Sequence, residues 1–163
     1  MKYLFLLLFP FLLNAQTNDL SKLASLEENE QVTIDISIGG CFGATTNAKI
    51  LIKKLDKVYE FVYIENIVET LSKIDVKLLL YKEKKEKWLK ENLHVLAKYG
   101  KKSILSEENY QAKIKLLRLI IKSFDDCKRK MSGEFSIIKI NSTSIQYHKF
   151  FTCHIMLLDF LDF

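Results

Sequence analysis

The sequence predicts an α+β domain in which an antiparallel sheet of about five strands carries two longer helices and a short C-terminal helix. Apolar and polar residues alternate within residues 32–64 and 134–151, which is typical of strands. Residues 82–130 instead carry apolar residues at helical spacing. An isolated hairpin is only marginally stable in water, so both groups of strands are expected to join one sheet.

Residues 1–15 have the pattern of a secretory signal peptide. Lys2 gives a positive start, residues 3–13 form an unbroken apolar run, and Ala15 places a small residue before a polar stretch. The apolar run is shorter than the roughly 20 residues that cross a bilayer. We therefore expect a secreted or periplasmic protein with no transmembrane segment after signal cleavage.

The chain after this segment has the length of one domain. Residues 16–31 are polar with scattered leucines and are expected to form an N-terminal arm, and residues 32–163 are expected to form a single α+β domain. Loss of Lys2 with the signal takes the formal net charge from +5 to +4. Lysine and glutamate are mixed in residues 82–87, which is typical of a solvated helix face. A nucleic-acid surface would be one-sided in charge, so no nucleic-acid partner is expected.

The first strand is predicted at residues 32–38, and Gly39 and Gly40 end it because glycine tolerates backbone angles that other residues avoid. Residues 45–64 fit two patterns. Their alternation predicts two strands joined by a turn at Asp56, whereas the spacing of their apolar residues also fits a helix. We favour strands because Val, Ile, Tyr and Phe are abundant here and suit a pleated surface.

Two helices are predicted in the middle of the chain. The first covers residues 82–99, where Trp88 and three leucines share one face, and Gly100 ends it. The second covers residues 106–130, with Ser106 as its cap and two glutamates in its first turn. The apolar stripe of the second helix is formed by Tyr110, Ile114, Leu117, Ile121 and Phe124.

The strand pattern returns near the C-terminus. Residues 135–140 and 145–151 are predicted to form a hairpin, with its turn at residues 141–144. The last residues are very apolar, and a short helix is expected over residues 153–162. This hairpin and helix complete the predicted α+β domain.

A possible catalytic motif lies at residues 39–43, whose sequence Gly-Gly-Cys-Phe-Gly fits the G-x-C-x-G pattern of a nucleophile elbow. Catalysis by Cys41 would need a helix directly after Gly43 and a nearby histidine, for which His148 and His154 are the candidates. The alternative is a loop between two strands. We favour the loop because the chain is short for the large parallel sheet that carries such elbows.

The three cysteines predict one disulfide in an oxidising compartment. Cys127 and Cys153 bracket the predicted C-terminal hairpin, which would bring them together, so we predict that these two pair; Cys41 with Cys153 is the alternative. Cys153 and His154, with His148 nearby, lack the four well-placed ligands that zinc prefers. We therefore expect no metal and no cofactor.

The motif also carries a resemblance. A glycine-flanked Cys-Phe-Gly, about five further residues and a Lys-Ile-Leu-Ile strand occupy residues 39–52. This stretch resembles a family of small uncharacterised secreted or lipoprotein domains of gram-negative bacteria. Members often have a later hairpin between two cysteines and a short terminal helix, to which Cys127, Cys153 and residues 152–163 would correspond. The chain departs from the family in lacking a second cysteine and a proline soon after the motif, and in its longer helices within residues 82–130. The resemblance implies a small α+β domain with no established activity.

Two classes of function follow. We expect a secreted non-catalytic interaction or envelope-associated module of unknown ligand, with a protein or envelope partner, because no complete catalytic set is present. The alternative is a small Cys-dependent hydrolase or thiol redox protein that uses Cys41. Reactivity of Cys41 toward a thiol probe in the folded, oxidised protein distinguishes the two classes.

Overall fold

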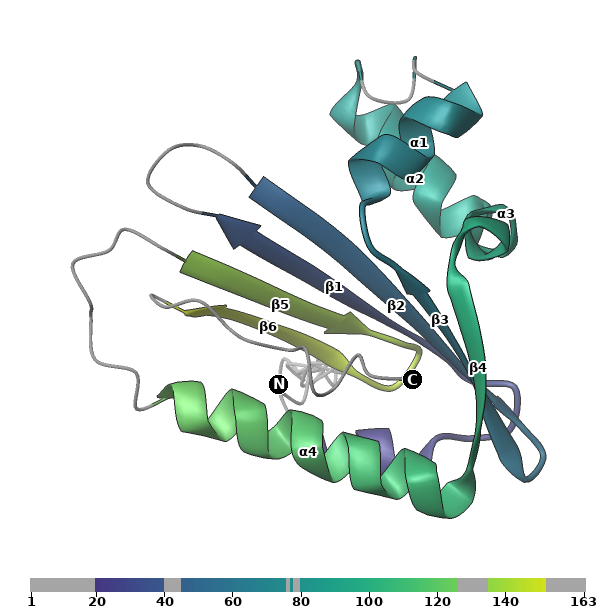
Figure 1. The fold of residues 1–163 in the computed structure, drawn as a ribbon, viewed down its shortest axis with the longest axis vertical. Coiled ribbons are helices and arrows are strands. Elements are labelled where there is room, and N and C mark those ends of the chain that lie inside the picture. The colour runs from purple at the N-terminus through teal and green to yellow at the C-terminus, as the bar shows by residue number, and fades with distance from the viewer. Residues whose placement is uncertain (1–19, 40–44, 76, 78–79, 126–134, 152–163) are drawn as a thin grey trace, which may run out of the picture.

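The computed structural model describes residues 20–39, 45–75, 77, 80–125 and 135–151 (Figure 1). They form a six-stranded sheet in the order β4-β3-β2-β1-β5-β6, in which every neighbouring pair is antiparallel. The predicted α+β class is confirmed, with six strands in place of about five.

The strands at both ends of the sequence meet in the middle of this sheet, as predicted. β1 pairs with β2 on one side and with β5 on the other, so the C-terminal hairpin extends the N-terminal meander. The strands are β1 (Gln31–Gly39), β2 (Thr45–Leu55), β3 (Val58–Ile64), β4 (Lys101–Ser106), β5 (Phe135–Asn141) and β6 (Gln146–Phe151).

Within the described residues, four α-helices and short 3₁₀ helices accompany the sheet. The α-helices are α1 (Ile67–Asp75), α2 (Lys82–Glu91), α3 (Leu93–Leu96) and α4 (Glu107–Asp125). The 3₁₀ helices are Leu20–Ser25 and Ala97–Tyr99. The predicted signal segment and the predicted helix at residues 153–162 lie outside the described residues.

Residues 45–64 form strands, which decides between the two patterns seen in the sequence. β2 and β3 pair along their length and are joined at Asp56, whose backbone φ of 50° lies in the left-handed region that Asp adopts more readily than most residues. β4 pairs with the outer side of β3 and lies outside the strands predicted from the sequence.

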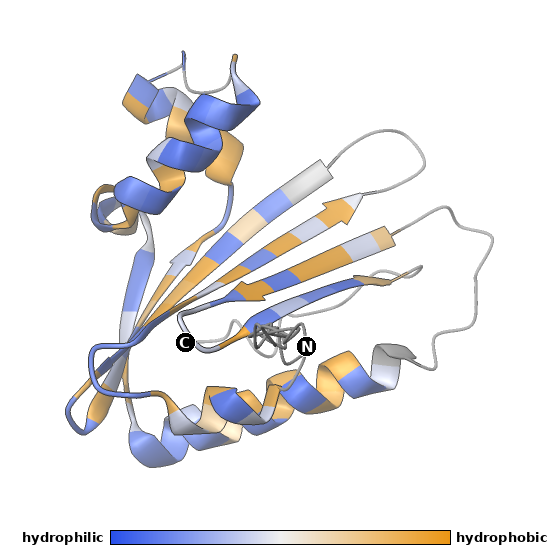
Figure 2. Ribbon diagram, turned by 180° about the vertical axis from the view of Figure 1, so that it is seen from behind, coloured by the Kyte–Doolittle hydropathy of each residue, from blue (hydrophilic) through white to orange (hydrophobic). Residues whose placement is uncertain are grey.

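The main core lies between the sheet and α4. Alternate residues of β1, β2, β3 and β5 face this helix and are buried against it, and Figure 2 shows the same alternation of hydropathy along the strands. From α4 the core receives four residues of the predicted stripe, Tyr110, Ile114, Leu117 and Ile121. Ser106 caps the helix as predicted, because its Oγ accepts a hydrogen bond from the Asn109 N–H at 3.3 Å.

Part of the predicted N-terminal arm belongs to this core. Leu23 and Leu26 are buried beneath α4, and the Tyr110 hydroxyl donates a hydrogen bond to the Leu23 carbonyl. Arg118 donates to the Leu20 carbonyl at 2.9 Å, which fastens the same segment to the helix. The segment before β1 therefore packs as an integral part of the domain.

Glu30 joins this segment to the turn between β5 and β6. Its buried carboxylate accepts hydrogen bonds from the Ser144 hydroxyl at 2.8 Å, the Thr143 hydroxyl at 3.2 Å and the Glu27 N–H at 3.0 Å. Burial alone would raise the pKa of Glu30, but these hydrogen bonds outweigh it and hold the pKa below its ordinary value. The ionised carboxylate thus ties two segments that are distant in sequence.

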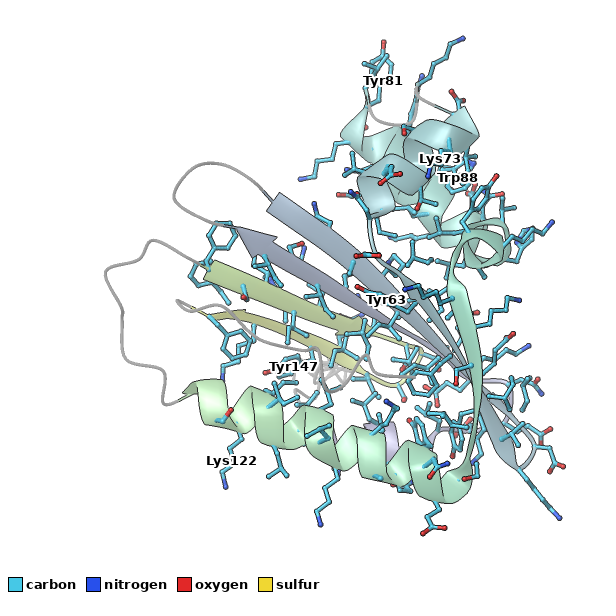
Figure 3. The ribbon with its side chains drawn as sticks, viewed as in Figure 1. Tyr63, Lys73, Tyr81, Trp88, Lys122 and Tyr147 are labelled. Carbon is cyan, nitrogen blue, oxygen red and sulfur yellow. The ribbon has the colours of Figure 1, made fainter. Side chains whose placement is uncertain are left out.

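The second face of the sheet carries a smaller core under α1, α2 and α3, which gather at one side of the molecule (Figure 1). Leu51, Val62 and Ile64 of the sheet are buried there against Leu71 and Leu96. Trp88, labelled in Figure 3, packs at the margin of this cluster.

The predicted helix at residues 82–99 is interrupted at Asn92, which corrects its continuous extent. The Asn92 backbone leaves the helical region, with φ −122° and ψ 30°. Its backbone N–H and its side-chain amide both donate to the Trp88 carbonyl, at 2.9 and 3.0 Å, and so close the last turn of α2. The Asn92 carbonyl then accepts from the N–H groups of Val95 and Leu96 as α3 begins. Gly100 follows the last turn, as predicted.

A candidate binding groove beside α2

A groove lies on the half of the second face that α1–α3 leave uncovered among the described residues. It has a volume of about 650 Å³. Its floor is formed by β1, β2 and β5, and one wall is formed by α2 and the start of α3. The groove thus begins where the small core under the helices ends.

A row of charged and polar residues crosses four neighbouring strands at the middle of this face. Asp35 of β1 is the direct partner of Lys49 on β2 and of Lys139 on β5, and Lys139 is in turn the partner of His148 on β6. Directly opposed residues of antiparallel strands share one face of the sheet. The order across the sheet is therefore Lys49, Asp35, Lys139 and His148.

Lys49 and Asp35 form an ion pair in the floor of the groove. Lys49 is only 6% exposed, whereas about a third of the Asp35 side chain is accessible (35%). Beside this pair, the Ser37 hydroxyl donates to Oδ1 of its cross-strand partner Asn47 at 2.7 Å. Both contacts fix side chains of β1 and β2 in defined positions, so this part of the floor is preformed.

Three lysines around the groove have no ion-pair partner among the described residues: Lys85 and Lys90 of α2, and Lys139 of β5. Glu86 and Lys90 both line the groove but form no ion pair with each other within the described helix; Lys87 pairs with Glu91, at 4.0 Å. Because the charge of Asp35 is balanced by Lys49, the groove carries an excess of positive charge.

The Gly-Gly-Cys-Phe-Gly motif, for which a nucleophile elbow is the disfavoured interpretation, lies between β1 and β2 in the chain. Residues 40–44, which include Cys41, lie outside the described residues. On either side of them, Gly39 at the end of β1 and Thr45 at the start of β2 are direct cross-strand partners. The chain continues after Gly43 into strand β2, whereas an elbow requires a helix there. The motif therefore joins two antiparallel strands, which is the alternative that we favoured.

His148 is the one predicted site histidine within the described residues. It is exposed on β6, directly opposite Lys139 of β5. Gly39, at the end of β1, is opposite Phe135 of β5, which is four residues from Lys139 along that strand. Four residues of strand span about 14 Å. His148 therefore faces the groove side of the sheet and lies well away from the end of β1.

The remaining predicted site residues, His154, Cys127 and Cys153, lie outside the described residues, so the disulfide stays a prediction. Among the residues that the structure describes, no three His, Cys, Asp or Glu side chains gather where they could hold a metal ion. None of the described helices is long and apolar enough to cross a membrane.

Comparisons with known proteins give no further information on the groove. No family model, curated protein or solved structure matches this chain. Its interpretation rests on the chemistry of its own residues.

That chemistry suits binding. The Ser37 hydroxyl donates its hydrogen bond to an amide oxygen, which does not act as a general base, so Ser37 is not activated as a nucleophile. Lys85 and Lys90 line the wall and Lys139 lines the floor, and half-buried Leu89 and Ile137 add apolar surface to the same lining. This lining is chemically complementary to a polar molecule that also has some apolar surface.

Proposed function

We propose that this protein is a secreted or periplasmic, non-catalytic interaction module that binds a protein or envelope partner in the groove beside α2. The observation that carries the proposal is the row of Lys49, Asp35, Lys139 and His148 on the part of the sheet that no described helix covers, flanked by lysines of α2. A preformed floor with free charged groups at its rim favours recognition, because little ordering is needed when a partner binds.

The proposed compartment rests on the signal-like residues 1–15 and on the three cysteines, with Cys127–Cys153 as the proposed disulfide. The resemblance to small secreted or lipoprotein domains of gram-negative bacteria supports the same compartment. A non-reducing peptide map tests the disulfide: a peptide that links Cys41 to either partner would refute the proposed pair.

The Cys-dependent hydrolase or thiol redox protein remains the alternative proposal, with Cys41 as nucleophile and His148 or His154 as base. The strand that follows the motif disfavours it, since an elbow nucleophile relies on a following helix. The exposed position of His148 on the central part of β6 adds no support.

Position-specific photo-crosslinking in the native host tests the interaction module. A photoreactive residue replaces Gln146, which is exposed at the groove, and in a matched control replaces Lys122, which extends from α4 away from the sheet (Figure 3). We expect one defined protein or envelope adduct from the groove position and none from the control. Equal adducts from both positions, or no adduct from the groove, would refute the proposed function.

A further inference from the structure

The lining of the groove indicates the chemistry of its occupant. Its charged members are Lys49, Lys85, Lys90, Lys139, Asp35 and Glu86. Asp35 is already paired with Lys49, and so Glu86 is the one acidic side chain set against three unpaired lysines among the described lining residues. The charge of the groove therefore complements a negatively charged partner.

The three lysines stand on two sides of the groove. Lys85 and Lys90 belong to the wall formed by α2, whereas Lys139 belongs to the floor on β5. A partner lying along the groove would pass between the two sides and meet ammonium groups on both. Negative charges on both flanks of the bound molecule would then pair with these lysines without displacing the Asp35–Lys49 ion pair.

The apolar part of the lining separates an acidic polypeptide from other polyanions. Leu89, Leu93 and Ile137 line the same groove, are partly exposed and offer a surface that apolar segments bearing carboxylates can cover. A nucleic acid or a sulfated polysaccharide places a charge on every unit. Such a polyanion would leave this apolar surface uncovered and bring negative charges against Asp35 and Glu86.

We infer that the groove binds an acidic polypeptide segment with interspersed apolar residues. This inference rests on the proposed function and specifies the partner of the same site. The lysines supply attraction and register, and the leucines and isoleucine supply the apolar contact area.

Binding of synthetic probes to the full mature chain tests the inference. The probes are a fluorescent peptide of glutamates and leucines, its counterpart with glutamine for each glutamate, dextran sulfate and single-stranded DNA. We expect the acidic peptide to bind and its affinity to fall as salt is raised, because the contacts lie at a solvent-accessible rim. The glutamine peptide should bind at least about tenfold more weakly.

Charge-reversal variants locate the binding surface. Lys85→Glu, Lys90→Glu and Lys139→Glu should each weaken the acidic peptide about fivefold, a typical effect for one solvent-accessible ion pair. Lys57→Glu and Lys122→Glu make the same charge change at exposed positions outside the groove and should leave the affinity unchanged. Equal weakening by all five variants would indicate a response to net charge and would overturn the inference.

Each other occupant gives a distinct result. Binding of dextran sulfate or DNA as tight as that of the peptide would overturn the polypeptide assignment. A crosslink from position 146 to residues 152–163 of the same chain, or a change of oligomeric state on Lys139→Glu, would instead assign the groove to the chain itself or to a second copy. If a groove adduct forms in cells but charge reversal leaves it unchanged, the acidic partner is refuted while the proposed function stands.

Discussion

Lys49 of β2 lies directly opposite Asp35 of β1, and its ammonium contacts the Asp35 carboxylate in the floor of the groove. The lysine is buried and the aspartate is about one-third accessible (35%). A buried cation is tolerated only when a partner offsets the loss of its hydration. Removal of either partner should therefore affect stability differently, because only the lysine is fully enclosed.

Asp35→Ala should destabilise the protein more than Lys49→Met. Loss of Asp35 leaves a buried ammonium unpaired, with an expected cost of about 2 kcal/mol in the free energy of unfolding. Loss of Lys49 leaves a carboxylate that water can still reach, so its cost should be smaller. The double variant should recover part of the loss, and urea denaturation of all four proteins provides the comparison. Additive effects in this cycle would contradict the coupling.

Glu30 predicts a loss of stability in acid. Its hydrogen bonds lower its pKa in the folded state despite burial, so its contribution is fully present above the unfolded-state pKa and is lost as the pH falls through the folded-state pKa. The free energy of unfolding of Glu30→Gln should therefore approach that of the wild type as the pH is lowered. Glu28→Gln, an exposed neighbour, should show no such convergence. A difference between wild type and Glu30→Gln that is constant with pH would contradict this linkage.

Gly100→Ala should lower the free energy of unfolding by about 2 kcal/mol, because the added methyl group would be forced against a backbone atom that cannot easily move. A Cβ at Gly100 would lie 2.9 Å from the Tyr63 carbonyl oxygen and also against the Val62 side chain. Gly39→Ala is the comparison, because the added methyl there would meet the far end of the Phe135 side chain, which can shift, and not a backbone atom. Thermal melting should show a larger drop in melting temperature for Gly100→Ala than for Gly39→Ala. The reverse order would contradict the prediction and would show that the surroundings of Gly39 yield less readily.

Cys41→Ser should leave partner binding unchanged and cost little stability, because the motif connects two paired strands. Crosslinking from position 146 and thermal melting provide the two measurements. Hydrolysis of a generic ester that disappears in Cys41→Ser, with the fold intact, would instead establish the catalytic alternative.

The elements with strong local patterns could be predicted from the sequence. Residues close together in the sequence are enough to predict three features: the alternation of β1, the turn at Asp56 and the apolar stripe of α4. β4 could not be predicted, because a six-residue edge strand with one buried residue, Leu105, has little periodic signal. The break at Asn92 is a change in the backbone angles of a single residue, for which the spacing of apolar residues carries no signal.

The groove could not be predicted from the sequence for a different reason. Its central row joins Lys49, Asp35, Lys139 and His148 from four strands, two of which are about a hundred residues further along the chain. Their meeting depends on the register of β1 with both β2 and β5, which local patterns do not specify. The sequence offered one indication of the groove, the alternation of polar and apolar residues in β1, which places Asp35 on the face away from the main core.

Amide chemical shifts locate the binding surface on the folded protein. The isotope-labelled mature protein is titrated with the glutamate–leucine peptide, and the shifts of the backbone N–H groups are followed. We expect the perturbed amides to cluster on α2 and on β1 and β5 around Lys85, Lys90 and Lys139. Perturbations confined to α4 or to the β4 edge, or spread evenly over the surface, would contradict a binding groove beside α2.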